Sequence, residues 1–250
     1  MKLDLASAIQ DYVYSHVVNN VLTACPARVV GVINDLFGLQ VNAQPLITYK
    51  GGVDNTDVIE QPVIYGVSVQ MPSSSTSAMT FPVNVGDPVL LVFSHDNIDT
   101  FMQGSGSFSA PSDDRVWSYM DCVAIPGWWP IGNSINNPAK RRLPHNTSDM
   151  VVAHNIGTPN ECEIRLKPSG DIDITSPATV NVKSAAANVT TTGNASVSAN
   201  GVSVTASGTA NISVTGAATV TAATLALNGI DWSTHTHLVT TLGAQSGPPV

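Results

Sequence analysis

Two histidines separated by one residue, His235 and His237, are the side chains whose type and spacing point most directly to chemistry. In an extended segment, residues i and i+2 point to the same side, so both imidazole rings can face one ligand. Two ligands fall short of a coordination set, but three chains around one axis supply six nitrogens. Six imidazoles suit iron, cobalt or nickel better than zinc, which takes four ligands, or calcium, which takes oxygen. The pair therefore predicts a metal site only in a trimer.

The sequence before this pair is repetitive. Residues 184–230 contain only Ser, Ala, Asn, Val, Thr, Gly, Ile and Leu, with no charge, no aromatic ring and no proline. Apolar residues recur at a spacing of eight, and further apolar pairs occur at a spacing of two, such as Val202 and Val204. This composition disfavours a helix and suits short strands. The pattern predicts an array of five-residue strands joined by three-residue corners.

One chain alone cannot bury such an array, because both sheet edges and most valines would stay in water. Two arrangements supply the missing contacts, a single-chain β-solenoid or several identical chains wound around one axis. Solenoid repeats usually have about twenty residues or more, so the short repeat favours several chains. Three chains close a triangular prism without lateral edges. We therefore expect a slender, rigid homotrimeric rod.

The first half of the chain has the pattern of a small β domain after one helix. Apolar residues at spacings of three and four predict an amphipathic helix over 5–22, whose apolar stripe either packs on its own barrel or contacts another protein. Five short apolar runs bounded by turn residues then suggest an antiparallel barrel. The strands are predicted over 28–33, 38–47, 63–70, 88–93 and 115–125. Two polar segments, 73–77 and 103–112, are expected to be exposed loops.

Composition limits the possible partners. The chain has 250 residues and a net charge of −8, and its only basic cluster is 140–142, so we expect no nucleic-acid partner. Cys25, Cys122 and Cys162 form no C-x-x-C pair, which predicts buried apolar residues rather than disulfides or a zinc site. The sequence shows no secretory signal and no window with the roughly 18 apolar residues of a membrane-spanning helix.

Two segments, 85–96 and 121–128, resemble the oligosaccharide/oligonucleotide-binding (OB) barrel of a known family, and the octad array with His235 and His237 resembles its needle. The family is the central spike, or membrane-piercing needle, of the baseplate of contractile-tailed bacteriophages. The resemblance covers roughly residues 24–250. It implies an all-β homotrimer with an N-terminal helix, an OB-fold barrel, an intertwined triple-stranded β-helix and a metal-capped apex.

The resemblance also implies a domain order, a metal and a location. It implies one iron ion, Fe2+ or Fe3+, per trimer, held by His235 and His237 of three chains. The barrel would dock on a baseplate hub protein, and the spike would be assembled in the host cytoplasm as part of the virion. It would pierce the host outer membrane during tail contraction, as a passive needle without enzymatic activity. The expected segments are a helical segment, the barrel, a linker or collar, the shaft and the apex, over 1–26, 27–130, 131–168, 169–230 and 231–250.

Two alternative classes of protein are a receptor-binding tail fibre and a polysaccharide-degrading tail protein with a β-helical stalk. Glycoside hydrolysis needs two carboxyl groups that flank a sugar, but Asp171, Asp173 and Asp231 are the only acids from residue 169 onward. The run 94–96 contains Ser, His and Asp, but catalytic triads are assembled from distant segments, so a turn is expected there. The pair Trp128 and Trp129 suits interface packing better than stacking on a ligand.

Overall fold

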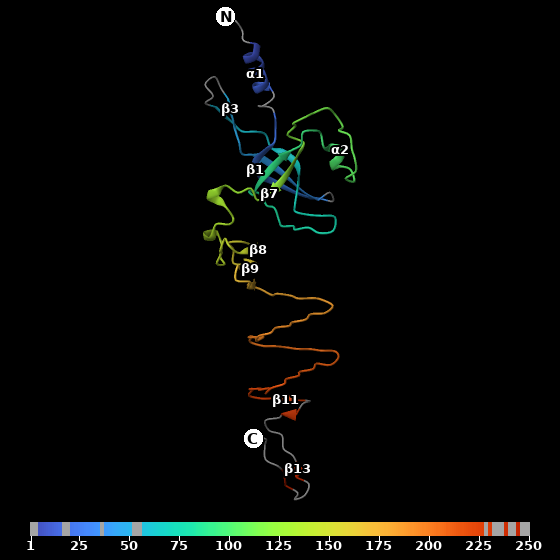
Figure 1. Ribbon diagram of the computed structural model, residues 1–250, viewed down its shortest axis with the longest axis vertical. Helices are drawn as coiled ribbons and strands as arrows, with labels where there is room; N and C mark the ends of the chain where they lie inside the picture. Colours follow the sequence, from blue (N-terminus) through green and yellow to red (C-terminus); the bar gives the residue numbers. More distant parts are fainter. Residues whose placement is uncertain are drawn as a thin grey trace. The chain divides into compact units, whose positions relative to one another are not determined.

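The computed structural model describes residues 5–16, 21–35, 38–51, 57–227, 230–231, 238–239 and 244–245. The chain divides into two compact units, Met1–Val182 and Lys183–Val250, and each is considered by itself. Strands make up most of the regular structure of the first unit, and helices are few (Figure 1). The mostly β class that the sequence predicts is therefore confirmed.

Helix α1 (Leu5–His16) forms the start of the described chain. It confirms the predicted helix over these residues, and residues 17–20 lie outside the described part. Its apolar stripe is not buried, since Leu5, Ile9 and Val13 are 72%, 55% and 44% exposed. Within one chain, the stripe therefore does not pack on the barrel.

A closed barrel of five strands forms the core of the first unit. The strands are hydrogen-bonded in the order β1, β2, β5, β7, β6 and back to β1. All neighbouring pairs are antiparallel except β5 and β7, which run parallel. This order with its single parallel pair is the strand arrangement of an OB-fold. The barrel strands are β1 (Ala24–Asp35), β2 (Gly38–Pro45), β5 (Ile64–Val69), β6 (Pro88–Phe93) and β7 (Cys122–Pro126).

The barrel is filled by alternate residues of its strands. In β6, for example, Val89 and Leu91 are fully buried, and their neighbours are only half-buried. Small residues such as Ala43 and Ala124 also lie fully inside, which suits the narrow interior of a five-stranded barrel. The alternation thus produces one continuous apolar core.

The connections of the barrel differ from the prediction in two places. The predicted strand over 115–125 begins only at Cys122, because residues 115–121 form a loop that includes short turns. A hairpin of β3 (Tyr49–Gly51) and β4 (Asp57–Ile59) lies between β2 and β5, where the sequence predicts only a turn. The segments 73–77 and 103–112 are exposed throughout, as expected, and the short helix α2 (Asp99–Met102) precedes the second.

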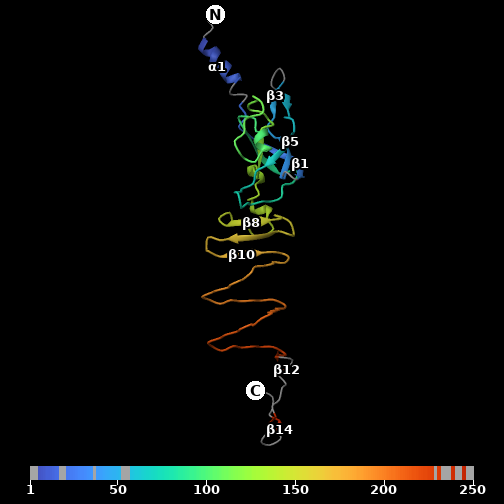
Figure 2. The same cartoon turned by 90° about the vertical axis from the view of Figure 1, so that its right-hand side faces the viewer.

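A second, three-stranded sheet follows the barrel in the sequence (Figure 2). The chain reaches it through two 3-10 turns, η2 (Ile131–Asn133) and η3 (Pro138–Lys140). The sheet is an antiparallel meander of β8 (Met150–His154), β9 (Cys162–Leu166) and β10 (Ile172–Thr175), with β9 in the middle. The first apolar pair of the octad array, Ile172 and Ile174, therefore lies in this sheet.

The repetitive segment forms extended legs without strands. Residues 176–225 contain no assigned strand, and Figure 1 shows the part after residue 183 as legs that reverse direction at regular intervals. Bends recur every seven or eight residues, in agreement with the predicted repeat. The bends lie at 177–178, 185, 192–193, 200, 207–208, 215–216 and 223.

Four two-residue strands complete the described part of the second unit. They are β11 (Ala226–Leu227), β12 (Ile230–Asp231), β13 (Leu238–Val239) and β14 (Ala244–Gln245). β11 pairs with β12, and β13 pairs with β14, both antiparallel. These pairs lie on either side of His235 and His237 in the sequence, and both histidines lie outside the described residues.

Candidate functional site

The sheet of β8, β9 and β10 carries an exposed patch of large aliphatic side chains, here called the apolar face. Residues that are paired across antiparallel strands have their side chains on the same face of the sheet. Two cross-strand rows of three residues make up the patch, and its side chains are between 39% and 65% exposed. The rows are Met150, Leu166 and Ile172, and next to it Val152, Ile164 and Ile174.

The opposite face of the same sheet is charged and buried. Glu163 and Arg165 of β9 are only 6% and 9% exposed. Arg165 forms ion pairs with Glu163 and Asp149, and it donates a hydrogen bond to the carbonyl oxygen of Pro144. The segment before β8 thus covers the charged face. This reverses the usual orientation of a half-buried strand, in which the apolar side chains are inside and the polar ones face water.

Glu161, which directly precedes β9, forms hydrogen bonds with the segment before β8 that covers the charged face. Its side chain is fully buried, and its Oε2 atom accepts hydrogen bonds from the backbone N–H groups of Arg142 at 2.6 Å and Gly157 at 2.9 Å. Burial alone raises the pKa of this carboxyl, but the N–H donors outweigh burial and hold the pKa of Glu161 below its usual range. The orientation of the sheet is therefore fixed by a charged anchor on its inner side.

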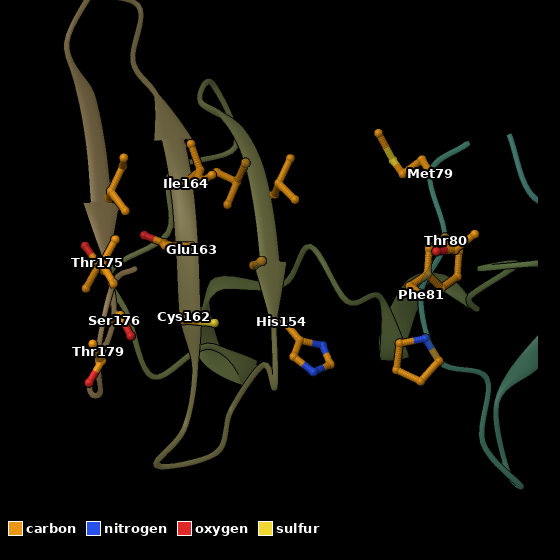
Figure 3. A pocket seen from close by; sticks show the side chains of 16 residues that line it. Met79, Thr80, Phe81, His154, Cys162, Glu163, Ile164, Thr175, Ser176 and Thr179 are labelled. Atoms are coloured by element: carbon orange, nitrogen blue, oxygen red, sulfur yellow. The ribbon is translucent and has the colours of Figure 1, made fainter. Parts of the chain in front are cut away.

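A broad cavity of about 750 Å³ adjoins the apolar face. Figure 3 shows Ile164, Cys162 and His154 on the strands, and Met79 with Phe81 on a barrel loop across from β8. Met79 and Phe81 are themselves 56% and 43% exposed. The apolar face thus continues into an open hollow whose lining combines aliphatic side chains with polar ones such as His154, Thr175 and Ser176.

The legs of residues 176–225 form a second unpartnered surface. Each leg carries one valine or isoleucine near its middle, and these side chains are between 68% and 92% exposed. No backbone hydrogen bond joins one leg to another in this fully described segment. The mid-leg residues are Val182, Val189, Val197, Val204, Ile212 and Val220. Within one chain the extended backbone of the legs is left to water, as at the unpaired edge of a sheet.

Arg115 forms three ion pairs within the segment that connects β6 and β7. Its guanidinium group contacts Asp99 at 2.7 Å and Asp113 at 3.0 Å. It also contacts Asp121 at 2.8 Å, whose side chain is fully buried. Hydrogen bonds from Arg115 hold the pKa of Asp121 below its usual range. Asp99, Asp113 and Asp121 are thus joined in one ion network through Arg115.

The other residues singled out from the sequence have structural surroundings. Within the run 94–96, His95 Nδ1 lies 2.9 Å from Asp96 Oδ1, and the run follows β6 as a bend, as expected. Lys140 Nζ lies 5.6 Å from the ring centroid of Trp129, a cation–π contact. Trp128 is 56% exposed. Interface packing at the tryptophan pair stays a prediction.

The three cysteines are free thiols. Cys122 is 5% exposed, and burial raises its pKa to about 12. Burial also raises the pKa of Cys25. Cys162 is half-buried at the edge of the apolar face. The prediction of buried apolar residues is thus confirmed for Cys122, whereas Cys25 and Cys162 are only half-buried.

The predicted metal ligands His235 and His237 are outside the described residues, so their geometry stays a prediction. Among the described residues, no group of three or more His, Cys, Asp or Glu side chains could hold a metal ion. No helix in the described ranges is long and apolar enough to cross a bilayer.

Comparison with known proteins gives one family. A family described as the phage protein Gp138 N-terminal domain matches residues 26–127, which is less than half of the chain. The matched residues cover the five strands of the closed barrel except for the first two residues of β1. No curated protein matches the sequence. The family match supports a bacteriophage structural protein and thus a component of the virion.

Proposed function

We propose that this chain forms the central spike of a phage tail baseplate, a passive homotrimeric needle that pierces the host outer membrane during tail contraction. The observation that carries the proposal is the series of extended legs over residues 176–225, which have no backbone partners in their own chain. Three intertwined copies would supply hydrogen bonds to every leg and close all lateral edges.

The side chains of the legs support the same arrangement. One or two valine or isoleucine residues per leg are too few for a leg to fold against its own chain, and the mid-leg side chains stay 68–92% exposed. In a triangular prism, one such side chain from each of three legs fills one layer of a narrow interior, with Ala, Ser and Thr on the outside. The product is a thin rod in which nearly every residue has a fixed partner.

The barrel is the part of the chain that supports the assignment of this rod to a phage particle. It covers the residues that match the phage protein Gp138 N-terminal domain, and it stands at the N-terminal side of the legs in the sequence. In the proposed spike, the barrel contacts a baseplate hub protein. The exposed stripe of α1, with Leu5, Ile9 and Val13, offers an additional apolar surface for that contact.

Composition suits the shaft to a membrane passage. Residues 184–230 carry no charged side chain, so the shaft has few groups whose dehydration would oppose entry into hydrocarbon. The energy for penetration would come from tail contraction, because a rigid rod needs no chemistry of its own. The proposed role is therefore mechanical rather than enzymatic.

The proposed apex is closed by one iron ion. Three copies of His235 and His237 provide six imidazole nitrogens, a donor set that fits octahedral iron. The ion would act structurally, by joining the three chain ends, which are the places where a rod frays first. The two histidines would bind and orient this ion without taking part in a reaction.

Immunogold electron microscopy of intact phage particles tests the proposal. Antibodies raised against the purified protein are expected to label the tip of the tail baseplate, and contracted tails are expected to keep or expose that label at the penetrating end. Label on the lateral fibres would support a receptor-binding fibre instead. Absence of the protein from purified virions would contradict the proposal.

A further inference from the structure

We infer that the apolar face of the β8–β10 sheet joins three copies of this chain and sets the register of the shaft. The inference rests on the proposed function, since it assigns to one sheet the task of aligning the trimer. It concerns an interaction surface whose occupant is a second and a third copy of the same chain.

The shaft alone specifies its register weakly. Five of the six mid-leg residues are valines, and the exception is Ile212. A slip of one chain by a whole leg would therefore exchange valine for valine in most layers, at little cost in packing. Strands with repetitive side chains are prone to such slippage. Another part of the chain has to align the three copies.

The apolar face has the features that the shaft lacks. Its two rows contain methionine, leucine, valine and isoleucine in an arrangement that does not repeat in the chain. The strand pairing around β9 is regular, with Ile164 opposite both Val152 and Ile174. Its position is also rigid, because Glu161, Glu163 and Arg165 anchor the other side of the sheet. A rigid and non-repetitive apolar surface has one best way to pack on its own copies.

Continuity of the chain identifies the occupant. β10 ends at Thr175, and the first leg with Val180 and Val182 begins within a few residues. The neighbours that pair with the legs must therefore be close to the apolar face, and those neighbours are copies of this chain. The cavity beside the face is lined by Val152, Ile164, Ile174 and Val180, so it links the sheet to the first leg. In the trimer, side chains of the other copies would fill it.

The test compares two matched pairs of substitutions in the full-length chain. Ile164→Thr with Ile174→Thr makes two of the three side chains in one row of the apolar face polar. Val58→Thr with Ile59→Thr makes the same kind of change on β4, where the two aliphatic side chains are exposed and lie outside both the apolar face and the shaft. Each protein is unfolded, refolded at equal concentration and analysed by size-exclusion chromatography with light scattering. Limited proteolysis checks that the barrel has refolded in both variants.

The sheet variant is expected to lose trimer yield by about tenfold or more, because each chain gives up two buried aliphatic groups at the aligning surface. The β4 variant is expected to stay within about twofold of the unsubstituted protein, because its two substituted side chains belong to neither the apolar face nor the shaft. Equal trimer yields for the sheet variant and the unsubstituted protein would overturn the inference, and so would an equal loss in both variants. In those two outcomes the proposed trimer still stands. If the unsubstituted protein refolds only as a monomer, the proposed function fails together with the inference.

Discussion

The substitution Ile212→Ala distinguishes an intertwined trimeric shaft from a monomeric chain. In one chain Ile212 is 92% exposed, so its truncation removes almost no burial. Substitutions at exposed positions usually change the free energy of unfolding by no more than about 0.5 kcal/mol. In an intertwined shaft the same side chain is buried, and Ile→Ala then costs about 2–5 kcal/mol per chain. Three chains lose roughly 6–15 kcal/mol per shaft, since the layers are identical in the three copies.

Guanidinium-chloride unfolding, followed by far-ultraviolet circular dichroism, measures this difference. A matched reference is Leu91→Ala, because Leu91 is fully buried in the barrel of each chain and its truncation costs about 2–5 kcal/mol whatever the oligomeric state. All samples need the same protein concentration, because subunit association stabilises by mass action. We expect both variants to unfold at lower denaturant. The reasoning is refuted if Leu91→Ala is destabilised and Ile212→Ala unfolds with the unsubstituted protein.

Three further predictions concern single sites. Because the pKa of Asp121 is depressed in the folded chain, its contribution to stability is present above the usual carboxyl pKa near 4 and is lost as the pH falls through the folded value. Acid should therefore lower the melting temperature below about pH 4. The substitution Asp121→Asn should flatten this pH dependence. Gly157→Ala should destabilise the β8–β10 region by about 1–3 kcal/mol in thermal unfolding. Gly157 has φ +77°, and a Cβ atom there would lie 2.6 Å from the backbone oxygen of Lys140. An unchanged melting curve would contradict this prediction. Replacing His235 and His237 by alanine should remove iron, as measured by elemental analysis, and leave the trimer assembled; retained iron would exclude these ligands.

The barrel was largely predictable, because its strands follow simple local rules. The run around Val89 and Leu91 alternates in burial and follows the turn at 85–86, and its predicted bounds, 88–93, agree with those of β6. The region before Cys122 was not predictable in this way. Its conformation depends on Arg115, which contacts aspartates that are up to 16 residues away in the sequence. Such an ion network leaves no periodic signal.

The alternation of β9 was also visible in the sequence, but the face that it buries was not. Glu163 and Arg165 alternate with Ile164 and Leu166, and either set could face inward. Charged residues face the inside here because residues 141–149 and Glu161 supply ion pairs and hydrogen bonds. Exposure of the aliphatic set in a single chain is the consequence, and only the three-dimensional structure shows it.

The proposed metal site at the apex is inferred from the sequence alone. The octad spacing of the legs agrees with the recurring bends, but the two histidines lie beyond the described legs. Their coordination depends on three chains, and a single sequence carries information on only one of them. The metal therefore follows from residue type and symmetry, and its test has to count chains and ions together.

A native mass spectrum of the purified full-length protein tests most directly whether three chains form an intertwined shaft with one iron ion. We expect one species with the mass of three chains, each near 26.0 kDa, and a single iron ion. A spectrum dominated by a metal-free monomer would contradict the intertwined shaft and the iron-capped apex together.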